Sequence, residues 1–303
     1  MGTSAFALPS LVAIHNAGHE ILAVITRPDS PKGRGLNISS PPILEKARRL
    51  GLPVLQPEKL KDIEQKLISL APDVMVTVAY GKILSRSILA IPKYGCVNLH
   101  PSLLPKYRGA SPIEGAIIEG EQETGVTTYF MDEGLDTGDI IMQRSITILP
   151  EENSEKLSER LAKEGANLLV DTLTQIEKGT ETRITQDHNV HTMTRPITTN
   201  NCLINWEWPV TKIANFIRAL APKIGAHTFL QGVRIKIWHA CPTSTISSSP
   251  PGTIIKISND SFLVATGENS LEVFELQPEN RKRIGAGEFA RGTRIKEGDR
   301  FGS

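Results

Sequence analysis

Short apolar runs and amphipathic segments alternate along the first two-thirds of the chain. Apolar runs with the length of buried strands lie at residues 20–25, 73–79, 95–100, 126–131 and 140–148, and segments with a helical apolar period lie at 4–16, 42–50, 61–70 and 155–177. Repeated alternation of strand and helix is typical of a mainly parallel sheet flanked by helices. We therefore predict an α/β domain over residues 1–182.

The pattern changes after residue 182. Residues 183–208 lack a sustained apolar period and are rich in threonine, which predicts a linker. An amphipathic helix at 210–220 is followed by five short apolar segments, at 226–230, 233–239, 252–257, 262–265 and 271–277. Closely spaced short strands favour a small barrel, so we predict a β-barrel (OB-like) domain over residues 209–303.

Composition narrows the class of protein. A chain of 303 residues, 39% of them hydrophobic, is long enough for two cores. Its cysteines, Cys96, Cys202 and Cys241, are odd in number and widely spaced, which argues against a disulfide framework or a zinc site. No apolar stretch reaches the roughly 18 residues that a membrane span needs, and the first residues do not read as a secretory signal. We expect a cytoplasmic protein with no membrane partner.

The net charge of +1 conceals an asymmetry between the two parts of the chain. Residues 1–208 carry 21 basic and 25 acidic residues, whereas residues 209–303 carry 13 basic and 8 acidic residues, a net of +5. A basic C-terminal third favours contact with a polyanion. An unevenly charged solvated surface is the alternative.

Residues that could take part in catalysis lie at the ends of two predicted strands. Asn98 and His100 are two residues apart at the end of the run 95–100, so their side chains leave the same face. The loop 131–139 that follows another strand contains Asp136 and three further carboxylates. An amide, an imidazole and a carboxylate could stabilise an oxyanion and move a proton. A structural histidine is the alternative, and the chain contains neither a GxSxG nucleophile motif nor a GxxxxGK[ST] phosphate loop.

A longer motif surrounds these residues. Asn98–Gly109 reads NLHPSLLPKYRG, and Leu135–Gly138 reads LDTG. Together they resemble the signature of the folate-dependent formyltransferases. The segments at 26–35, 78–81 and 216–220 are similar to the branch of this family that formylates methionyl-tRNA, and the resemblance runs from Gly2 to Ile295.

The resemblance implies a Rossmann-like formyltransferase domain that uses 10-formyltetrahydrofolate as formyl donor and initiator methionyl-tRNA as acceptor, in support of translation initiation. By position, Asn98, His100 and Asp136 would be catalytic, and no metal would be required. Residues expected along the folate are Ser102, Leu103, Leu104, Pro105, Tyr80 and Ile83.

The resemblance also implies where tRNA would bind. The glycine-rich segment 30–38 reads as a surface loop, and in the family it is an insertion that meets the acceptor stem; Lys32 and Arg34 are its basic residues. In the basic C-terminal domain, we expect Arg281, Lys282 and Arg283 to face phosphates. We expect a monomer.

Three alternatives remain: a formyltransferase acting on a nucleotide-linked amino sugar, a hydrolase of 10-formyltetrahydrofolate, and a non-catalytic RNA-binding protein. Two departures from the family stand out. Residues 221–225 read APKIG in place of the family's Pro-Trp-Pro-Gly type of turn. The family also carries a strand before the Gly2-Thr3 pair, so we expect an upstream first strand that precedes Met1.

Overall fold

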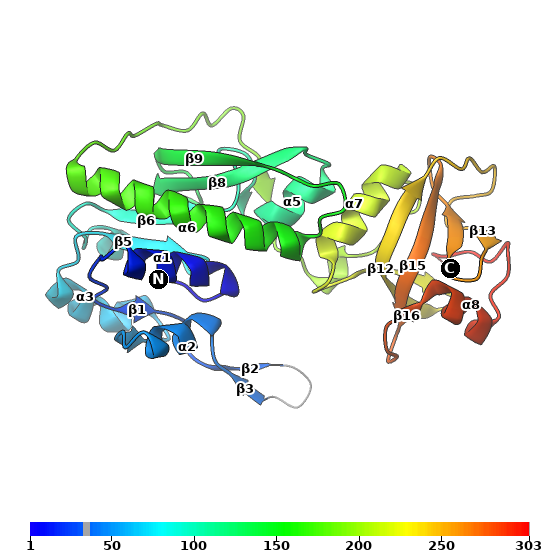
Figure 1. Cartoon of the computed structure of the whole chain (residues 1–303), viewed down its shortest axis with the longest axis horizontal. Coiled ribbons are helices and arrows are strands. Elements are labelled where there is room, and N and C mark those ends of the chain that lie inside the picture. The colour runs from blue at the N-terminus through cyan, green and yellow to red at the C-terminus, as the bar shows by residue number, and fades with distance from the viewer. Residues whose placement is uncertain (33–36, 303) are drawn as a thin grey trace. The chain divides into compact units, whose positions relative to one another are not determined.

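A computed structural model of the chain describes residues 1–32 and 37–302, and for residues 31, 32 and 37–39 it describes the backbone alone (Figure 1). The chain divides into two compact units. Unit 1 comprises Met1–Gly109, Thr124–Thr147 and Ser158–Thr194, and unit 2 comprises Ala110–Glu123, Ile148–Leu157 and Arg195–Ser303.

The main sheet of unit 1 has the strand order β5-β6-β8-β9. These strands are β5 (Met75–Val78), β6 (Cys96–His100), β8 (Glu123–Phe130) and β9 (Ile140–Thr147). β5 and β6 are parallel, whereas β6 and β8 are antiparallel. A second parallel pair joins β1 (Val24–Ile25) to β4 (Val54–Leu55). The predicted α/β class with a mainly parallel sheet is confirmed.

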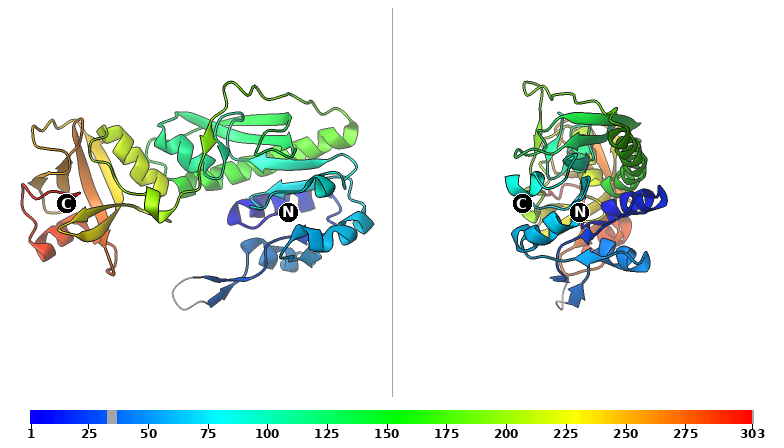
Figure 2. Two further views of the ribbon diagram at one scale, coloured as in Figure 1. Left: turned by 180° about the vertical axis from the view of Figure 1, so that it is seen from behind. Right: turned by 90° about the vertical axis from the view of Figure 1, so that its left-hand side faces the viewer.

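Helices flank this sheet. They are α1 (Leu8–Asn16), α2 (Pro42–Arg49), α3 (Glu64–Leu70), α4 (Arg86–Leu89) and the long α6 (Ser154–Lys178). α6 runs along the sheet (Figure 1, Figure 2), with Thr172 Oγ1 2.7 Å from Thr128 Oγ1 of β8. A Cβ on Gly165 would lie 2.7 Å from Leu99 of β6, so this glycine permits the close approach of helix and strand.

The segment expected to be a surface loop is partly ordered as strand. β2 (Ser30–Lys32) pairs antiparallel with β3 (Asn37–Ser39). Glycine, proline and charge dominate this segment, so it lacks the apolar alternation by which a strand is recognised in a sequence. The described ends of the segment expected to be a surface loop therefore form two short paired strands.

The amino end of the chain lies between β1 and β5. The Gly2 N–H donates to Ile25 O of β1 at 2.9 Å, and the Val78 N–H of β5 donates to Met1 O at 2.9 Å. The Met1 ammonium donates to Val76 O at 2.5 Å. Alternating hydrogen bonds to the two sides are the pattern of a strand placed between two parallel neighbours.

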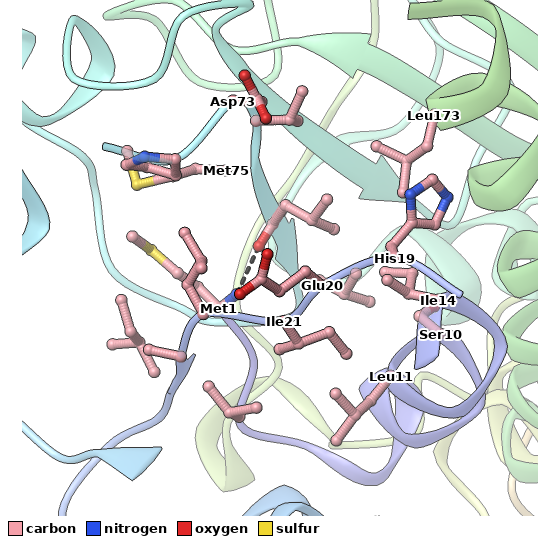
Figure 3. Close-up of a pocket in the computed structure, with 18 of the residues that line it drawn as sticks. Met1, Ser10, Leu11, Ile14, His19, Glu20, Ile21, Asp73, Met75 and Leu173 are labelled. Atoms are coloured by element: carbon pink, nitrogen blue, oxygen red, sulfur yellow. Dashed lines mark hydrogen bonds between the residues drawn. The ribbon is translucent and has the colours of Figure 1, made fainter. Parts of the chain in front are cut away.

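A cavity of about 440 Å³ adjoins this amino end (Figure 3). Its lining is mostly apolar and includes Leu11, Val24, Met75, Val76 and Leu173. Burial in this region lowers the pKa of the Met1 ammonium from 8.0 to about 6.

Unit 2 is an antiparallel sheet packed on helices. The sheet order is β11-β12-β15-β14-β13, and β16 pairs with β15. Its strands are β11 (Ala226–Leu230), β12 (Val233–Thr243), β13 (Ile254–Ile257), β14 (Phe262–Ala265), β15 (Ser270–Pro278) and β16 (Ile284–Gly285). Its helices include α5 (Pro112–Ile118), α7 (Val210–Leu220) and α8 (Ala286–Thr293). The five predicted strands and the predicted helix at 210–220 are all present.

The core of unit 2 joins the apolar face of α7 to the inner faces of the strands. Ile213 and Ile217 of α7 pack in one buried cluster with Ile237, Leu271 and Phe289. Such burial, at roughly 25 cal/mol per Å² of apolar surface, is what holds the sheet and helices together. Among the described residues, none of the helices is long and apolar enough to cross a membrane.

Candidate active site

The site begins where β6 ends. Asn98 and His100 are at the carboxyl end of β6, beside the parallel strand β5. Tyr129 of β8 lies directly opposite Asn98 in the antiparallel register. Asp136 follows in the loop after β8 and has φ 56°, a left-handed conformation that aspartate adopts more readily than bulkier residues.

A chain of hydrogen bonds links the amide to the carboxylate. Asn98 Nδ2 donates to Tyr129 Oη at 3.0 Å, and the Tyr129 hydroxyl donates to Asp136 Oδ1 at 2.7 Å. The second carboxylate oxygen, Oδ2, accepts from the Gly109 N–H at 2.7 Å. Both oxygens of Asp136 therefore have a donor, which holds the carboxylate in one orientation.

His100 lies between this carboxylate and a main-chain carbonyl. Its Nε2 is 2.9 Å from Tyr107 O, and because a carbonyl oxygen only accepts, Nε2 carries a hydrogen. Its Nδ1 is 3.6 Å from Asp136 Oδ2, and the two side chains are 5% and 11% exposed. The carboxylate thus faces the second ring nitrogen, and the Tyr107 carbonyl and Asp136 together orient the imidazole ring.

The predicted trio is thus brought together in a nearly buried cluster. Such a cluster offers an amide N–H for a developing negative charge, and an imidazole beside a carboxylate is suited to proton transfer. Burial strengthens both interactions, because water screens them less.

Sequence reasoning missed the residues that support the trio. Gln186 Nε2 donates to Asp136 O at 3.0 Å and to Gly138 O at 2.7 Å, and its Oε1 accepts from Arg108 Nε at 3.0 Å. Gln186 lies in a segment without apolar period, so no pattern pointed to it. Tyr129 could have been found from the sequence, because it lies close to Asp136 along the chain and carries a hydroxyl in an otherwise buried strand.

The expected folate residues lie in two places. Ser102 is fully buried, and its Oγ donates to Lys106 O at 2.7 Å. Leu104 is buried against Tyr129 and Ile140, and its N–H donates to Thr127 Oγ1 at 3.2 Å. Leu103 and Pro105 are half-buried in the same turn.

Tyr80 and Ile83 follow β5. Tyr80 is 1% exposed, and its hydroxyl has no hydrogen-bond partner among the described residues. Burial raises the pKa of the Tyr80 phenol. Ile83 is 84% exposed, an uncommon state for a large apolar side chain.

The expected tRNA residues differ in their surroundings. Arg34 lies outside the described residues, and Lys32 lies in β2, where only backbone is described. Arg281 and Lys282 are exposed between β15 and β16. The Arg283 guanidinium carbon lies 3.6 Å from the centroid of the Trp238 ring, and the guanidinium donates to Pro222 O at 2.8 Å. Part of its capacity for cation–π contact and hydrogen bonding is therefore used within the protein.

The described residues contain no group of three or more His, Cys, Asp or Glu side chains that could hold a metal ion.

Comparison with known proteins now identifies the class. Residues 1–173 match the family described as formyl transferase, and residues 196–294 match its C-terminal domain. A methionyl-tRNA formyltransferase of Thermodesulfovibrio yellowstonii is 46% identical over 300 residues, which cover 98% of this chain and 96% of the relative. One of Pelotomaculum thermopropionicum is 44% identical over 301 residues, with 98% and 96% covered.

The chain belongs to the methionyl-tRNA formyltransferase family. Solved structures at lower identity show the same fold. The N-formyltransferase of Helicobacter canadensis, in complex with folinic acid and dTDP-3-aminofucose, has a TM-score of 0.68 at 20% identity and covers 93% of this chain and 97% of its own. HypX of Aquifex aeolicus with tetrahydrofolic acid has a TM-score of 0.59 at 15% identity and covers 81% of this chain and 43% of its own.

Proposed function

We propose that this protein transfers the formyl group of 10-formyltetrahydrofolate to the α-amino group of initiator methionyl-tRNA and so supports translation initiation. The observation that carries the proposal is the identity of 41–46% to methionyl-tRNA formyltransferases over nearly the whole chain. The buried cluster of Asn98, His100 and Asp136 supplies chemistry suited to that transfer.

In the proposed reaction, the amine nitrogen attacks the formyl carbon. A new N–C bond forms, and the carbonyl electron pair moves to oxygen, where an N–H of Asn98 stabilises the oxyanion. The carbonyl then re-forms as the bond from carbon to folate N10 breaks. One proton leaves the amine and one reaches N10, so the products are formyl-methionyl-tRNA and tetrahydrofolate.

His100 and Asp136 would handle those protons. An imidazolium at His100 would supply positive charge beside the oxyanion. Asp136 holds the ring and, through water, accepts the proton of the amine, while His100 donates toward the intermediate by exchanging its bond to Tyr107 O. The reaction as proposed needs no metal.

The folate would lie along Ser102–Pro105, Tyr80 and Ile83. The exposed Ile83 side chain suits the apolar face of a pteridine ring. The tRNA phosphates would contact Lys32 and Arg34 in unit 1, and Arg281, Lys282 and Arg283 in unit 2. We further propose a cytoplasmic monomer with a catalytic domain at 1–182, a linker at 183–208 and a tRNA-binding domain at 209–303.

The test compares three acceptors with one labelled donor. Formyl-labelled 10-formyltetrahydrofolate is given to the purified protein with methionyl-initiator tRNA, with a nucleotide-linked amino sugar, or with water alone. We expect label to enter methionyl-tRNA only. Transfer to the amino sugar, release of labelled formate, or tRNA binding without transfer would each replace the proposal with a named alternative.

A further inference from the structure

We propose that Tyr129 is a positioning residue for formyl transfer, because it locks the Asn98 amide and the Asp136 carboxylate into one hydrogen-bonded unit. This inference rests on the proposed function. Tyr129 reaches neither the donor nor the acceptor in this account, and it acts through its two neighbours.

The direction of the hydrogen bonds is fixed by chemistry. An ionised carboxylate only accepts, so the Tyr129 hydroxyl donates its single hydrogen to Asp136 Oδ1, at 2.7 Å. Toward Asn98, the phenol oxygen can then only accept a hydrogen bond through its lone pairs. The group of Asn98 that faces it is therefore Nδ2, at 3.0 Å, rather than Oδ1.

This arrangement determines what Asn98 presents to a substrate. One N–H of Nδ2 is committed to Tyr129, and the planar amide then directs the second N–H at a fixed angle. The negative charge of Asp136 polarises the phenol, which makes its oxygen a better acceptor for Asn98. An oxyanion donor that is held in place before the reaction stabilises the transition state without reorganisation.

Register and burial hold the phenol in place. Tyr129 is directly opposite Asn98 across β6 and β8 and is 2% exposed. Burial and the nearby charge of Asp136 raise the pKa of Tyr129 well above its usual value, so the phenol stays a neutral donor across the working pH range.

Removal of the hydroxyl should affect the reaction and the carboxylate together. Without the phenol, Asp136 keeps only the Gly109 N–H as a donor, so the carboxylate is held less firmly. The titratable groups that face this pair are His100, 3.6 Å from Asp136, and Asp132, whose charge also acts on Tyr129. Both remain in a Tyr129→Phe variant, which isolates the effect of the hydroxyl.

The experiment uses Tyr129→Phe with Thr124→Val as matched control. Thr124 lies on the same strand, is buried, and its hydroxyl has no hydrogen-bond partner among the described residues. For Tyr129→Phe we expect kcat to fall about ten-fold, the value of one aligned hydrogen bond, with both KM values unchanged. Thr124→Val should match the wild type.

Two further measurements keep the result decisive. The side-chain amide ¹H–¹⁵N resonances of Asn98, assigned with Asn98→Ala, report its hydrogen bond to Tyr129 even if the wild type formylates no tRNA, so failure of this inference is separable from failure of the proposed function. These resonances should shift in Tyr129→Phe and stay in place in Thr124→Val. 3-Fluorotyrosine at position 129 retains the ring and the donor, and should keep kcat near that of the wild type. A Tyr129→Phe enzyme with unchanged kcat, or with unchanged Asn98 amide resonances, overturns the inference.

Discussion

At the scale of single residues, the central feature is that each side chain of the trio is directed by a neighbour. His100 Nε2 is held by Tyr107 O, Asp136 by Gly109 and Tyr129, and Asn98 by Tyr129. Holding catalytic groups in this way removes the cost of orienting them during the reaction. Individual substitutions should therefore lower kcat more than they weaken binding.

Asn98→Ala tests this most simply at the oxyanion. We expect kcat to fall by about 10²–10³, the usual consequence of losing one oxyanion donor, with KM for tRNA and folate little changed. Steady-state formylation with both substrates varied provides the measurement. A rise in KM at constant kcat would assign Asn98 to ground-state binding instead.

Gly138→Ala tests the loop that carries Asp136. A Cβ at this position would lie 1.7 Å from Phe130 O, so the loop must shift. We expect a loss of about 1–3 kcal/mol in unfolding free energy, measured by urea denaturation, together with loss of formylation. Gly292→Ala is the control, since a Cβ there meets nothing within 4 Å and alanine favours a helix. Equal stability of the two variants would argue against a tightly packed loop.

The positions of the candidate site residues show how far such a site can be predicted from a sequence. Asn98 and His100 could be predicted from their place at a strand end, but Asp136 is 36 residues further on than His100 in the sequence, and only the resemblance assigned it. Gln186 lies in a threonine-rich segment and reaches Asp136 through main-chain carbonyls. Contacts of that kind depend on tertiary placement and leave no local pattern.

At the scale of elements, apolar runs in the sequence predicted where the strands lie better than they predicted which strands pair and in which direction. β11 and β14 have the predicted bounds, and β12 extends beyond its predicted end to Thr243. The antiparallel placement of β8 beside β6 could not be predicted, because a fully buried strand shows the same apolar run in either direction. The two-residue β1 is shorter than its apolar run, since pairing and not hydropathy sets the length of a strand.

The buried ammonium of Met1 predicts a pH-dependent stability. Its pKa is about 6 in the folded protein and 8.0 for an exposed amino terminus, so the unfolded state binds more protons between these values. The unfolding free energy should therefore rise with pH from about 6 to 8, by up to about 2–3 kcal/mol. Urea denaturation at several pH values measures this rise, and N-terminal acetylation should remove it. A rise of the same size in the acetylated protein would assign it to other groups.

The cavity beside Met1 predicts a second effect. An extension of four or five apolar residues before Met1 should continue the alternating hydrogen bonds to β1 and β5 and fill part of the roughly 440 Å³ space. We expect a higher Tm than for the unextended chain, because apolar surface leaves water. A glycine-serine extension of equal length is the control. Equal Tm values for both extensions would show that the space does not accept a strand.

At the scale of the whole molecule, charge is divided along the chain. Residues 209–303 have a net charge of +5, and the exposed Arg281 and Lys282 belong to that segment. Contact between such residues and phosphates releases counterions, so tRNA affinity should fall steeply with salt.

A double variant, Arg281→Ala with Lys282→Ala, tests this charge directly. We expect weaker tRNA binding and a slope of log K against log salt that is shallower by about 1–2 units. Lys61→Ala with Lys66→Ala, an exposed pair near α3, is the control and should leave the slope unchanged. Fluorescence titration at several salt concentrations supplies the slopes. A slope that becomes shallower only in Lys61→Ala with Lys66→Ala would show that the tRNA phosphates contact that pair and not Arg281 and Lys282.

The most direct test of the account is formyl transfer from 10-formyltetrahydrofolate to methionyl-initiator tRNA by the wild type and by His100→Ala, with tRNA affinity measured in parallel. The wild type should form formyl-methionyl-tRNA, and His100→Ala should lose turnover while its tRNA affinity stays within about two-fold, because His100 lies in the buried cluster. Undiminished transfer by His100→Ala, or no transfer by the wild type, would contradict the account.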